Sequence, residues 1–146
     1  MAFEPRNPDY AAAAAAIFKD AAFVADLGIE PAEIGPGRVD SRLVPQARHL
    51  QHDGVIHAGV QATMADHTAG AAAYTLIGAD QIVLTVNFLI NLLQVAVGEE
   101  LRCRSRVLRA GRRMVVAESE VFAVAQGKVR LCSKATVTLA VIDRQR

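Results

Sequence analysis

Residues 49–75 combine a glycine-marked turn, the start of a predicted helix and a carboxylate within that helix. From Ala58 to Tyr74 the chain contains neither proline nor a run of β-branched residues, which predicts a helix. The first N–H groups of this helix, near Ala58, Gly59 and Val60, lack intrahelical partners and lie at the positive end of the helix dipole. The start of this helix is therefore expected to bind an oxyanion.

Asp66 lies about two turns into the predicted helix, on a face of small residues. That face reads Gly59, Ala62, Thr63, Asp66, Ala69, Gly70 and Ala73 and carries no other charge. A carboxylate between small neighbours leaves room for a ligand, and it can act as a nucleophile or as a base toward water. An ordinary solvated helix carboxylate is the alternative interpretation, but it explains the surrounding alanines less well.

Other groups that could do chemistry have less favourable settings. His57, directly before the helix, can contact a ligand or form a structural hydrogen bond between turn and sheet. No two of the four histidines are four residues apart, so no metal site is expected. Cys103 and Cys132 have no metal-ligand spacing and alternate inward with strand residues, which is typical of core positions. The serines lack the glycine context of a nucleophile elbow, so a serine triad is not indicated.

The composition predicts a globular protein with one main domain. The chain has 146 residues, is 52% apolar and has a formal net charge of +1, so no overall field attracts nucleic acid or a membrane. Two cysteines do not make a disulfide framework, which fits a reducing cytoplasm. The longest uncharged run, residues 81–98, contains four amide side chains, and neither a membrane span nor a signal peptide is expected.

The elements that must position the central helix can be identified in chain order. Residues 1–28 are expected to form a helical extension, with Asp9 as N-cap and Gly28 just beyond the helix end. Residues 29–146 then form the main domain, in which period-two alternation predicts a strand at residues 38–44 and a long strand at residues 82–93. In the long strand, Leu84, Phe88 and Ile90 are expected on one side and Thr85 on the other.

Three further strands are predicted after Gly98, Gly111 and Gly127, each with alternating apolar residues. A sheet of such strands can bury both its own apolar face and an alanine-rich helix only by curling around that helix. The predicted class is therefore α+β, with a long central helix wrapped by a curved antiparallel sheet.

At this point the sequence resembles the hot-dog fold acyl-CoA thioesterases, in particular the phenylacetate-degradation and 4-hydroxybenzoyl-CoA thioesterase type. Residues 54–59 (GVIHAG) are similar to the G-x-x-H-G-G turn of that family, and Asp66 follows His57 by nine residues, where the family has Asp or Glu. Residues 85–88 (TVNF) match the strand after the helix, and residues 108–112 (LRAGR) match the next hairpin. The resemblance covers residues 29 to 142 or so.

The resemblance implies site residues from two chains. Asp66 would be the nucleophile or the base that activates water, and the Ala58 and Gly59 amides would bind the thioester oxygen. Gln51 would lie beside the carbonyl or the water, and Thr85 would help to hold the water. Gln51 and the helix start of one chain would face Asp66 and Thr85 of the other, so the family implies a homodimer, and we expect a dimer of dimers.

Further residues are expected to contact the substrate. His57, Thr63 and Gly70 border or share the face of Asp66. Arg112, Arg113 and Lys134 are candidates for the CoA phosphates, because a hairpin tip beside the site could reach them. The basic stripe at residues 102–106 lacks interleaved aromatics and is better explained as a solvated strand face than as a nucleic-acid site.

The sequence thus predicts a cytoplasmic thioester hydrolase acting on an aromatic or medium-chain acyl-CoA, with no cofactor, since the CoA belongs to the substrate. Two alternatives stay open at this stage. The chain could be an acyl-CoA-binding protein without turnover, because alanine replaces the usual glycine at position 58. An enoyl-CoA hydratase is disfavoured, because Asp66 and His67 are adjacent on a helix and point about 100° apart.

Overall fold

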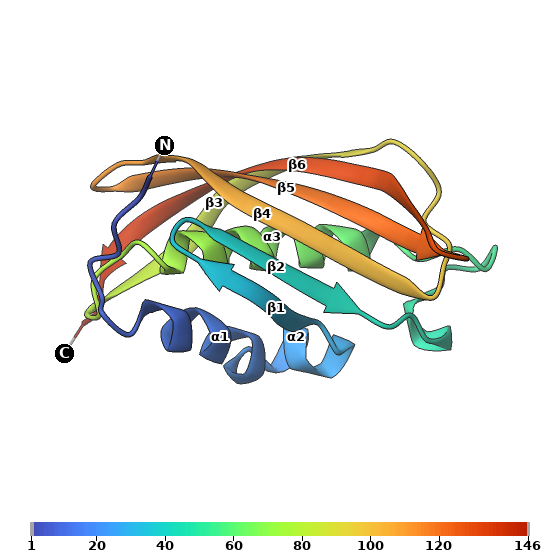
Figure 1. Ribbon diagram of the computed structural model, residues 1–146, viewed down its shortest axis with the longest axis horizontal. Helices are drawn as coiled ribbons and strands as arrows, with labels where there is room; N and C mark the ends of the chain where they lie inside the picture. The colour runs from blue at the N-terminus through green and yellow to red at the C-terminus, as the bar shows by residue number, and fades with distance from the viewer. Residues whose placement is uncertain (1, 146) are drawn as a thin grey trace.

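A computed structural model describes residues 2–145, and it has one curved antiparallel sheet around a long helix (Figure 1). The elements in chain order are α1 (Tyr10–Asp20), α2 (Ala22–Leu27), β1 (Glu30–Gly35), β2 (Arg38–Leu43), the 3-10 turn η1 (Ala47–His49), α3 (Ala58–Tyr74), β3 (Gln81–Leu92), β4 (Glu100–Ala110), β5 (Met114–Ala125) and β6 (Lys128–Asp143). The sheet order is β1-β2-β4-β5-β6-β3. The α+β architecture expected from the sequence is therefore confirmed.

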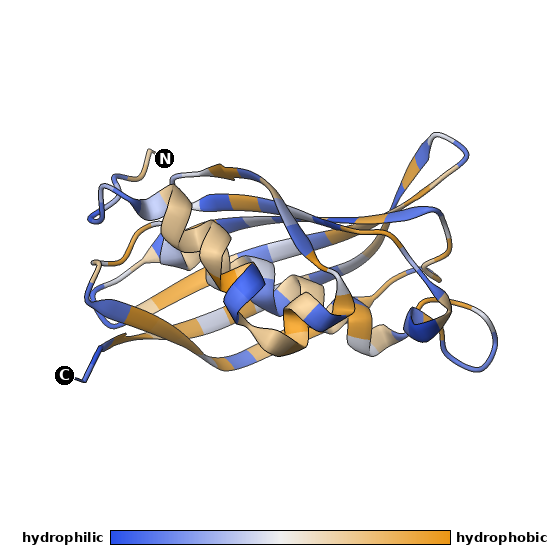
Figure 2. Ribbon diagram, turned by 90° about the horizontal axis from the view of Figure 1, so that it is seen from below, coloured by the Kyte–Doolittle hydropathy of each residue, from blue (hydrophilic) through white to orange (hydrophobic). Residues whose placement is uncertain are grey.

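Helix α3 lies inside the curve of the sheet because its side chains are small. Ala65, Ala69 and Ala72 are fully buried, and a Cβ built on Gly70 would lie 3.8 Å from Cδ2 of Leu139 in β6. Apolar and polar residues alternate along the strands (Figure 2), so the inner face of each strand can pack against the helix. Small helix residues allow backbone and sheet to approach closely, and this sets the position of everything that α3 carries.

The N-terminal extension packs on α3 and β1, but it is two helices rather than the single helix expected. Ala21 adopts an extended conformation between α1 and α2. In one continuous helix, Phe18 and Val24 would point about 120° apart, whereas both are buried here. Asp9 occupies the predicted N-cap position without a side-chain cap, and Gly28 ends α2 with φ 84°, as expected for a left-handed C-cap.

Strand β3 forms one edge of the sheet and contains a bulge that the strict alternation did not predict. Thr85 pairs with Leu139 of β6, but Asn87 pairs with Thr138, so Val86 is an extra residue. Because of the bulge, odd-numbered residues face the core before Val86 and even-numbered residues face it afterwards. Val83 and Ile90 therefore both pack against the core. The prediction that Thr85 and Ile90 face opposite sides is therefore wrong, because Thr85 points inward toward α3.

Gly98, before β4, is required by a close approach of two backbone segments. A Cβ built on this residue would overlap the carbonyl oxygen of Val124 in β5. We expect Gly98→Ala to lower the free energy of unfolding by about 1–3 kcal/mol, measured by chemical denaturation. Gly70→Ala is the matched control, since its Cβ would make only ordinary contacts and alanine favours a helix. Equal losses of stability in the two variants would contradict this explanation.

Candidate active site

Asp66 and Thr85 form a hydrogen-bonded pair at the middle of α3. The Thr85 hydroxyl donates to Oδ1 of Asp66 over 2.8 Å. Asp66 is half-buried and Thr85 is exposed on the edge strand β3, so the carboxylate is held in place and still reaches the surface. The sequence predicted both residues as site residues, and the bulge at Val86 explains how Thr85 comes to point at the helix while the rest of β3 packs normally.

A buried polar cluster fixes the helix turn that carries Asp66. The Ser119 hydroxyl donates to the carbonyl of Ala65 over 2.7 Å, and it lies 2.6 Å from the hydroxyl of Ser105. The hydroxyl groups of Ser41 and Thr68 lie 2.7 Å apart. Sequence reasoning missed the role of these residues. The available signal was a serine at the inward position of three strands, β2, β4 and β5, that pack against the same helix.

The cysteines and His67 do not supply a nucleophile or a base. Burial raises the pKa of the Cys103 thiol to about 11, so the thiol stays protonated at neutral pH. Burial also lowers the pKa of His67, whose Nε2 lies 3.1 Å from the carbonyl oxygen of Ile17 in α1. The His67 ring packs edge-on against Phe18. Its ring therefore faces the N-terminal helices, which argues against a hydratase that would pair it with Asp66.

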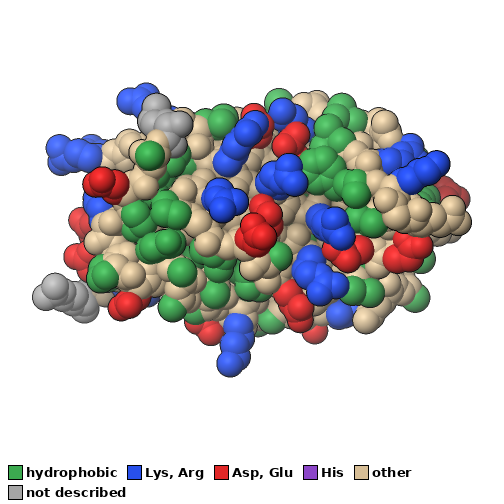
Figure 3. Space-filling model, viewed as in Figure 1, with side chains coloured by type: hydrophobic (Ala, Val, Ile, Leu, Met, Phe, Trp, Pro, Cys, Tyr) green, Lys and Arg blue, Asp and Glu red, His purple; other side chains and the backbone are tan. Residues whose placement is uncertain are grey.

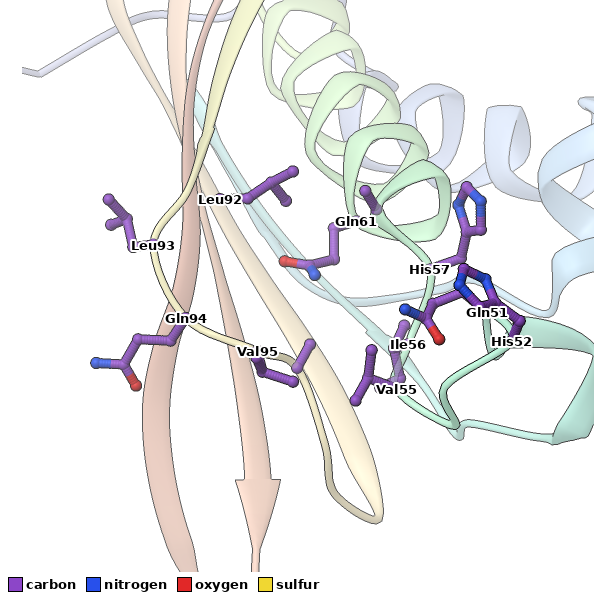
Figure 4. A pocket seen from close by; sticks show the side chains of 12 residues that line it. Gln51, His52, Val55, Ile56, His57, Gln61, Leu92, Leu93, Gln94 and Val95 are labelled. Carbon is purple, nitrogen blue, oxygen red and sulfur yellow. The ribbon is translucent and has the colours of Figure 1, made fainter.

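The start of α3 lines a pocket of about 670 Å³. Figure 4 shows the pocket between the first turn of α3 and the segment that follows β3. Its polar side chains come from Gln51, His52, His57, Gln61 and Gln94. Its apolar walls come from Val55, Ile56, Ala58, Leu92, Leu93, Val95 and Ala96. The pocket therefore offers a mostly apolar space next to the helix start.

The backbone N–H groups of Ala58 and Gly59, at the helix start, differ in whether they already have a hydrogen-bond acceptor. His57 is the N-cap, and its Nδ1 accepts a hydrogen bond of 2.8 Å from the Gly59 N–H. Among the described residues, the Ala58 N–H has no hydrogen-bond acceptor. Ala58 has a negative φ, so alanine causes no backbone strain where the related family has glycine. The Ala58 N–H is therefore the amide that is free to bind an oxyanion. The Gly59 N–H can contribute only if the His57 ring turns away.

Gln51 belongs to the tight turn before the helix. Its side-chain oxygen accepts from the Asp53 N–H, and its own N–H donates to the carbonyl of Val55 over 2.8 Å. Gly54 completes this turn with φ 81°, as the sequence predicted. The side-chain NH₂ group of Gln51 remains directed to the pocket that the residue lines, and it can donate to a ligand.

Within one chain, the expected site residues fall into two separate groups. Gln51, His57 and Ala58 line the pocket at the helix start, together with Leu92 at the end of β3. Asp66 lies about 12 Å further along the helix, beside Thr85 close to the middle of β3. The single chain does not bring these groups together.

Two further expected contacts are used internally. The Thr63 hydroxyl donates to the Gly59 carbonyl over 2.8 Å within the helix, although the residue is half-buried and close to the surface. Gly70 is buried against Leu139 in the core. Gly70 therefore serves the packing of helix on sheet, and nothing in its surroundings supports a contact with substrate.

The basic candidates for the CoA phosphates lie on exposed parts of the sheet. Arg112 and Arg113 are exposed in the turn between β4 and β5. Lys134 pairs with Glu118 over 3.3 Å on the outer face, where basic and acidic side chains alternate (Figure 3). Burial raises the pKa of Glu118, but Arg106 and Lys134 outweigh that effect and hold the pKa below its usual value. Lys134 is thus already partnered, and the two arginines stay the better predictions.

The part of the chain that the structure describes has neither a metal-type cluster of side chains nor a helix that could span a membrane. No group of three or more histidine, cysteine or acidic residues is placed to hold a metal ion in residues 2–145. No helix in the same range is long and apolar enough to cross a membrane.

Comparisons with known proteins show the family to which this chain belongs. The family described as the thioesterase superfamily matches residues 53–130, more than half of the chain. A Caenorhabditis elegans protein that is provisionally named an esterase is 32% identical over 120 residues, which cover 80% of this chain and 68% of that protein.

Solved structures give the same result. A thioesterase family protein from Silicibacter pomeroyi is 32% identical, with a TM-score of 0.90 over 92% of this chain and 98% of that chain. A conserved protein from Pseudomonas aeruginosa is 34% identical, with a TM-score of 0.76 over 83% of this chain and 94% of that chain. The curved sheet around α3 is the hot-dog fold, and the chain belongs to the thioesterase superfamily.

Proposed function

We propose that the protein hydrolyses acyl-CoA thioesters at a site shared by two copies of the chain. The observation that carries this proposal is the Asp66–Thr85 pair close to the middle of β3, together with the free Ala58 amide at a pocket beside Leu92, where the strand ends. Membership of the thioesterase superfamily supports thioester hydrolysis in general. The apolar pocket walls support an aromatic or medium-chain acyl group.

The edge strand β3 supports a homodimer. Its residues and the following segment expose large apolar side chains, namely Leu84, Val86, Phe88, Leu89, Leu92, Leu93, Val95 and Val97. An exposed, apolar edge strand tends to pair with another strand, and a contiguous apolar surface marks an interface. Antiparallel pairing of β3 with β3 of a second copy would extend the sheet and cover this surface.

Such pairing would also complete the site. Thr85 and Leu92 are roughly 23 Å apart along the strand. A two-fold axis near Phe88 and Leu89 would place Thr85 of one copy opposite Leu92 of the other. The carboxylate of Asp66 would then approach the helix start of the second copy, which its own chain cannot achieve. The pairing of dimers into tetramers stays a prediction.

The proposed chemistry uses the Ala58 N–H of one copy and the Asp66 carboxylate of the other. Ala58 N–H donates to the thioester oxygen and stabilises the negative charge that develops there, while Asp66 either attacks the carbonyl carbon or removes a proton from the attacking water. Collapse of the tetrahedral intermediate breaks the carbon–sulfur bond, and CoA leaves as the thiolate and takes up a proton. Direct attack would leave an acyl anhydride on Asp66, which water then hydrolyses.

A thiol-release assay over a panel of acyl-CoA esters tests this function. We expect release of free CoA with a preference for aromatic or medium-chain acyl groups. Thermal stabilisation by acyl-CoA without any release of thiol would instead support a binding protein without turnover. No release and no binding across the panel would remove the proposal.

We expect Leu89→Lys to make the protein a monomer, because Leu89 is 68% exposed on β3 and a buried lysine pair at the two-fold axis would repel. Sedimentation velocity measures this change, and the thiol-release rate should fall with the loss of dimer. Val129→Lys is the matched control, since Val129 is similarly exposed but lies on β6 away from the edge. A wild-type protein that is monomeric and active would contradict the shared site.

A further inference from the structure

Gln61 is a buried carboxamide whose oxygen lacks a partner. The residue is only 3% exposed, and Oε1 has no hydrogen bond to any described residue. Gln61 follows Ala58 by one turn of α3 and lines the pocket at the helix start. Figure 4 shows its side chain extending from α3 across the pocket toward Leu92. Buried polar groups almost always have a partner, so this one needs an explanation.

The surroundings of Gln61 do not supply that partner. The walls that face the amide across the pocket are aliphatic, from Leu92, Val95 and Ile56. An aliphatic residue at position 61 would fill such a site without leaving an unpaired atom. The glutamine is therefore explained better by a ligand that brings a polar group next to these aliphatic walls.

We propose that Gln61 selects acyl groups that carry a hydroxyl close to the thioester carbonyl. This inference rests on the proposed thioesterase function and adds a specificity residue to the same site. A hydroxyl both donates and accepts, so it satisfies the amide whichever of its two ends faces the pocket. The unpaired atom would also discriminate against the analogue that lacks the hydroxyl, because a plain chain leaves the amide unsatisfied.

The position of Gln61 restricts where the hydroxyl lies. Ala58, the proposed donor to the carbonyl oxygen, is one helical turn away, about 4.5 Å along the axis of α3. A group that contacts the Gln61 amide must therefore be near the carbonyl and not at the far end of a medium-length chain. Among hydroxylated six-carbon acyl groups, the structure favours the 3-hydroxy over the 6-hydroxy compound.

The test compares hexanoyl-CoA, 3-hydroxyhexanoyl-CoA and 6-hydroxyhexanoyl-CoA in the wild type and in Gln61→Leu. We expect the wild type to prefer the 3-hydroxy ester over the plain ester by about tenfold in kcat/KM. Gln61→Leu should abolish that preference, and the 6-hydroxy ester should show no dependence on residue 61. Gln81→Leu, at the beginning of β3, is the matched substitution and should keep the preference.

Binding of non-hydrolysable thioether analogues, measured by calorimetry, separates this inference from the proposed hydrolysis. If no thiol is released but the wild type binds the 3-hydroxy analogue about tenfold more tightly than the plain one, and Gln61→Leu does not, then the function fails and the inference stands. If the wild type bound and hydrolysed the 3-hydroxy compound and the plain compound equally well, the selective role of Gln61 would be overturned. A Gln61→Leu variant that changes only the dimer dissociation constant would also overturn it, since the amide would then serve the second copy.

Discussion

Asp66→Asn is expected to lower kcat by about 100-fold or more, because the amide can neither attack the thioester nor take a proton from water. The asparagine oxygen can still accept the hydrogen bond from Thr85, which lies 2.8 Å from the carboxylate. The fold and the Thr85 contact should therefore survive, and KM should change little. Thiol release gives the rate, and thermal unfolding reports whether the fold is unchanged.

Glu120→Gln is the matched control for this loss of charge. Glu120 is a half-buried acid on the outer face of β5, away from the pocket. Its substitution should leave kcat within the error of the wild type. Equal turnover in wild type and Asp66→Asn would exclude the carboxylate as the acting group.

Ala58→Pro is expected to lower kcat by about 100- to 1000-fold, the range seen when one oxyanion donor is removed. Proline lacks the N–H that should bind the thioester oxygen, yet it is well tolerated as the first residue of a helix. The preceding residue, His57, has φ −61° and ψ 139°, a conformation that proline accepts in its neighbour. The variant therefore removes the proposed donor with little effect on the helix.

Ala58→Ser, which keeps the N–H, is the control and should retain most of the activity. The two inactive variants can also be combined. In a mixed dimer of Ala58→Pro and Asp66→Asn chains, one of the two shared sites has both functional groups, so subunit exchange should restore roughly a quarter of the wild-type rate. No recovery after verified exchange would mean that each site lies within one chain. Full activity of Ala58→Pro would assign the oxyanion contact to another donor.

The sequence determined the elements and their order. Small residues without proline predicted α3, and alternating apolar residues with glycine-marked turns predicted the strands from β2 to β6. These signals act between residues that are close in the sequence, so they can be recognised without the tertiary structure. The same local signals predicted Asp66 and the helix start as site residues. They also predicted the turn at Gly54, whose φ of 81° confirms the need for glycine.

Only the tertiary structure decided how these residues are used. Pairing of β3 with β6 creates the bulge that turns Thr85 toward Asp66, and nothing in the alternating pattern of β3 indicates it. The cap by His57 on Gly59 and the unpaired amide of Gln61 likewise depend on atoms that the fold places nearby.

The separation of the site residues into two groups along β3 has the same cause. Helix α3 lies alongside an edge strand, so the helix start comes to the Leu92 end of that strand and Asp66 comes to Thr85, close to the middle of the strand. Periodicity shows which side of an element is apolar, but a hydrogen bond between distant segments depends on register and packing. The types and spacing of the residues therefore determined the family of chemistry, and the packing of the sheet on α3 decided which atoms remain free to carry it out.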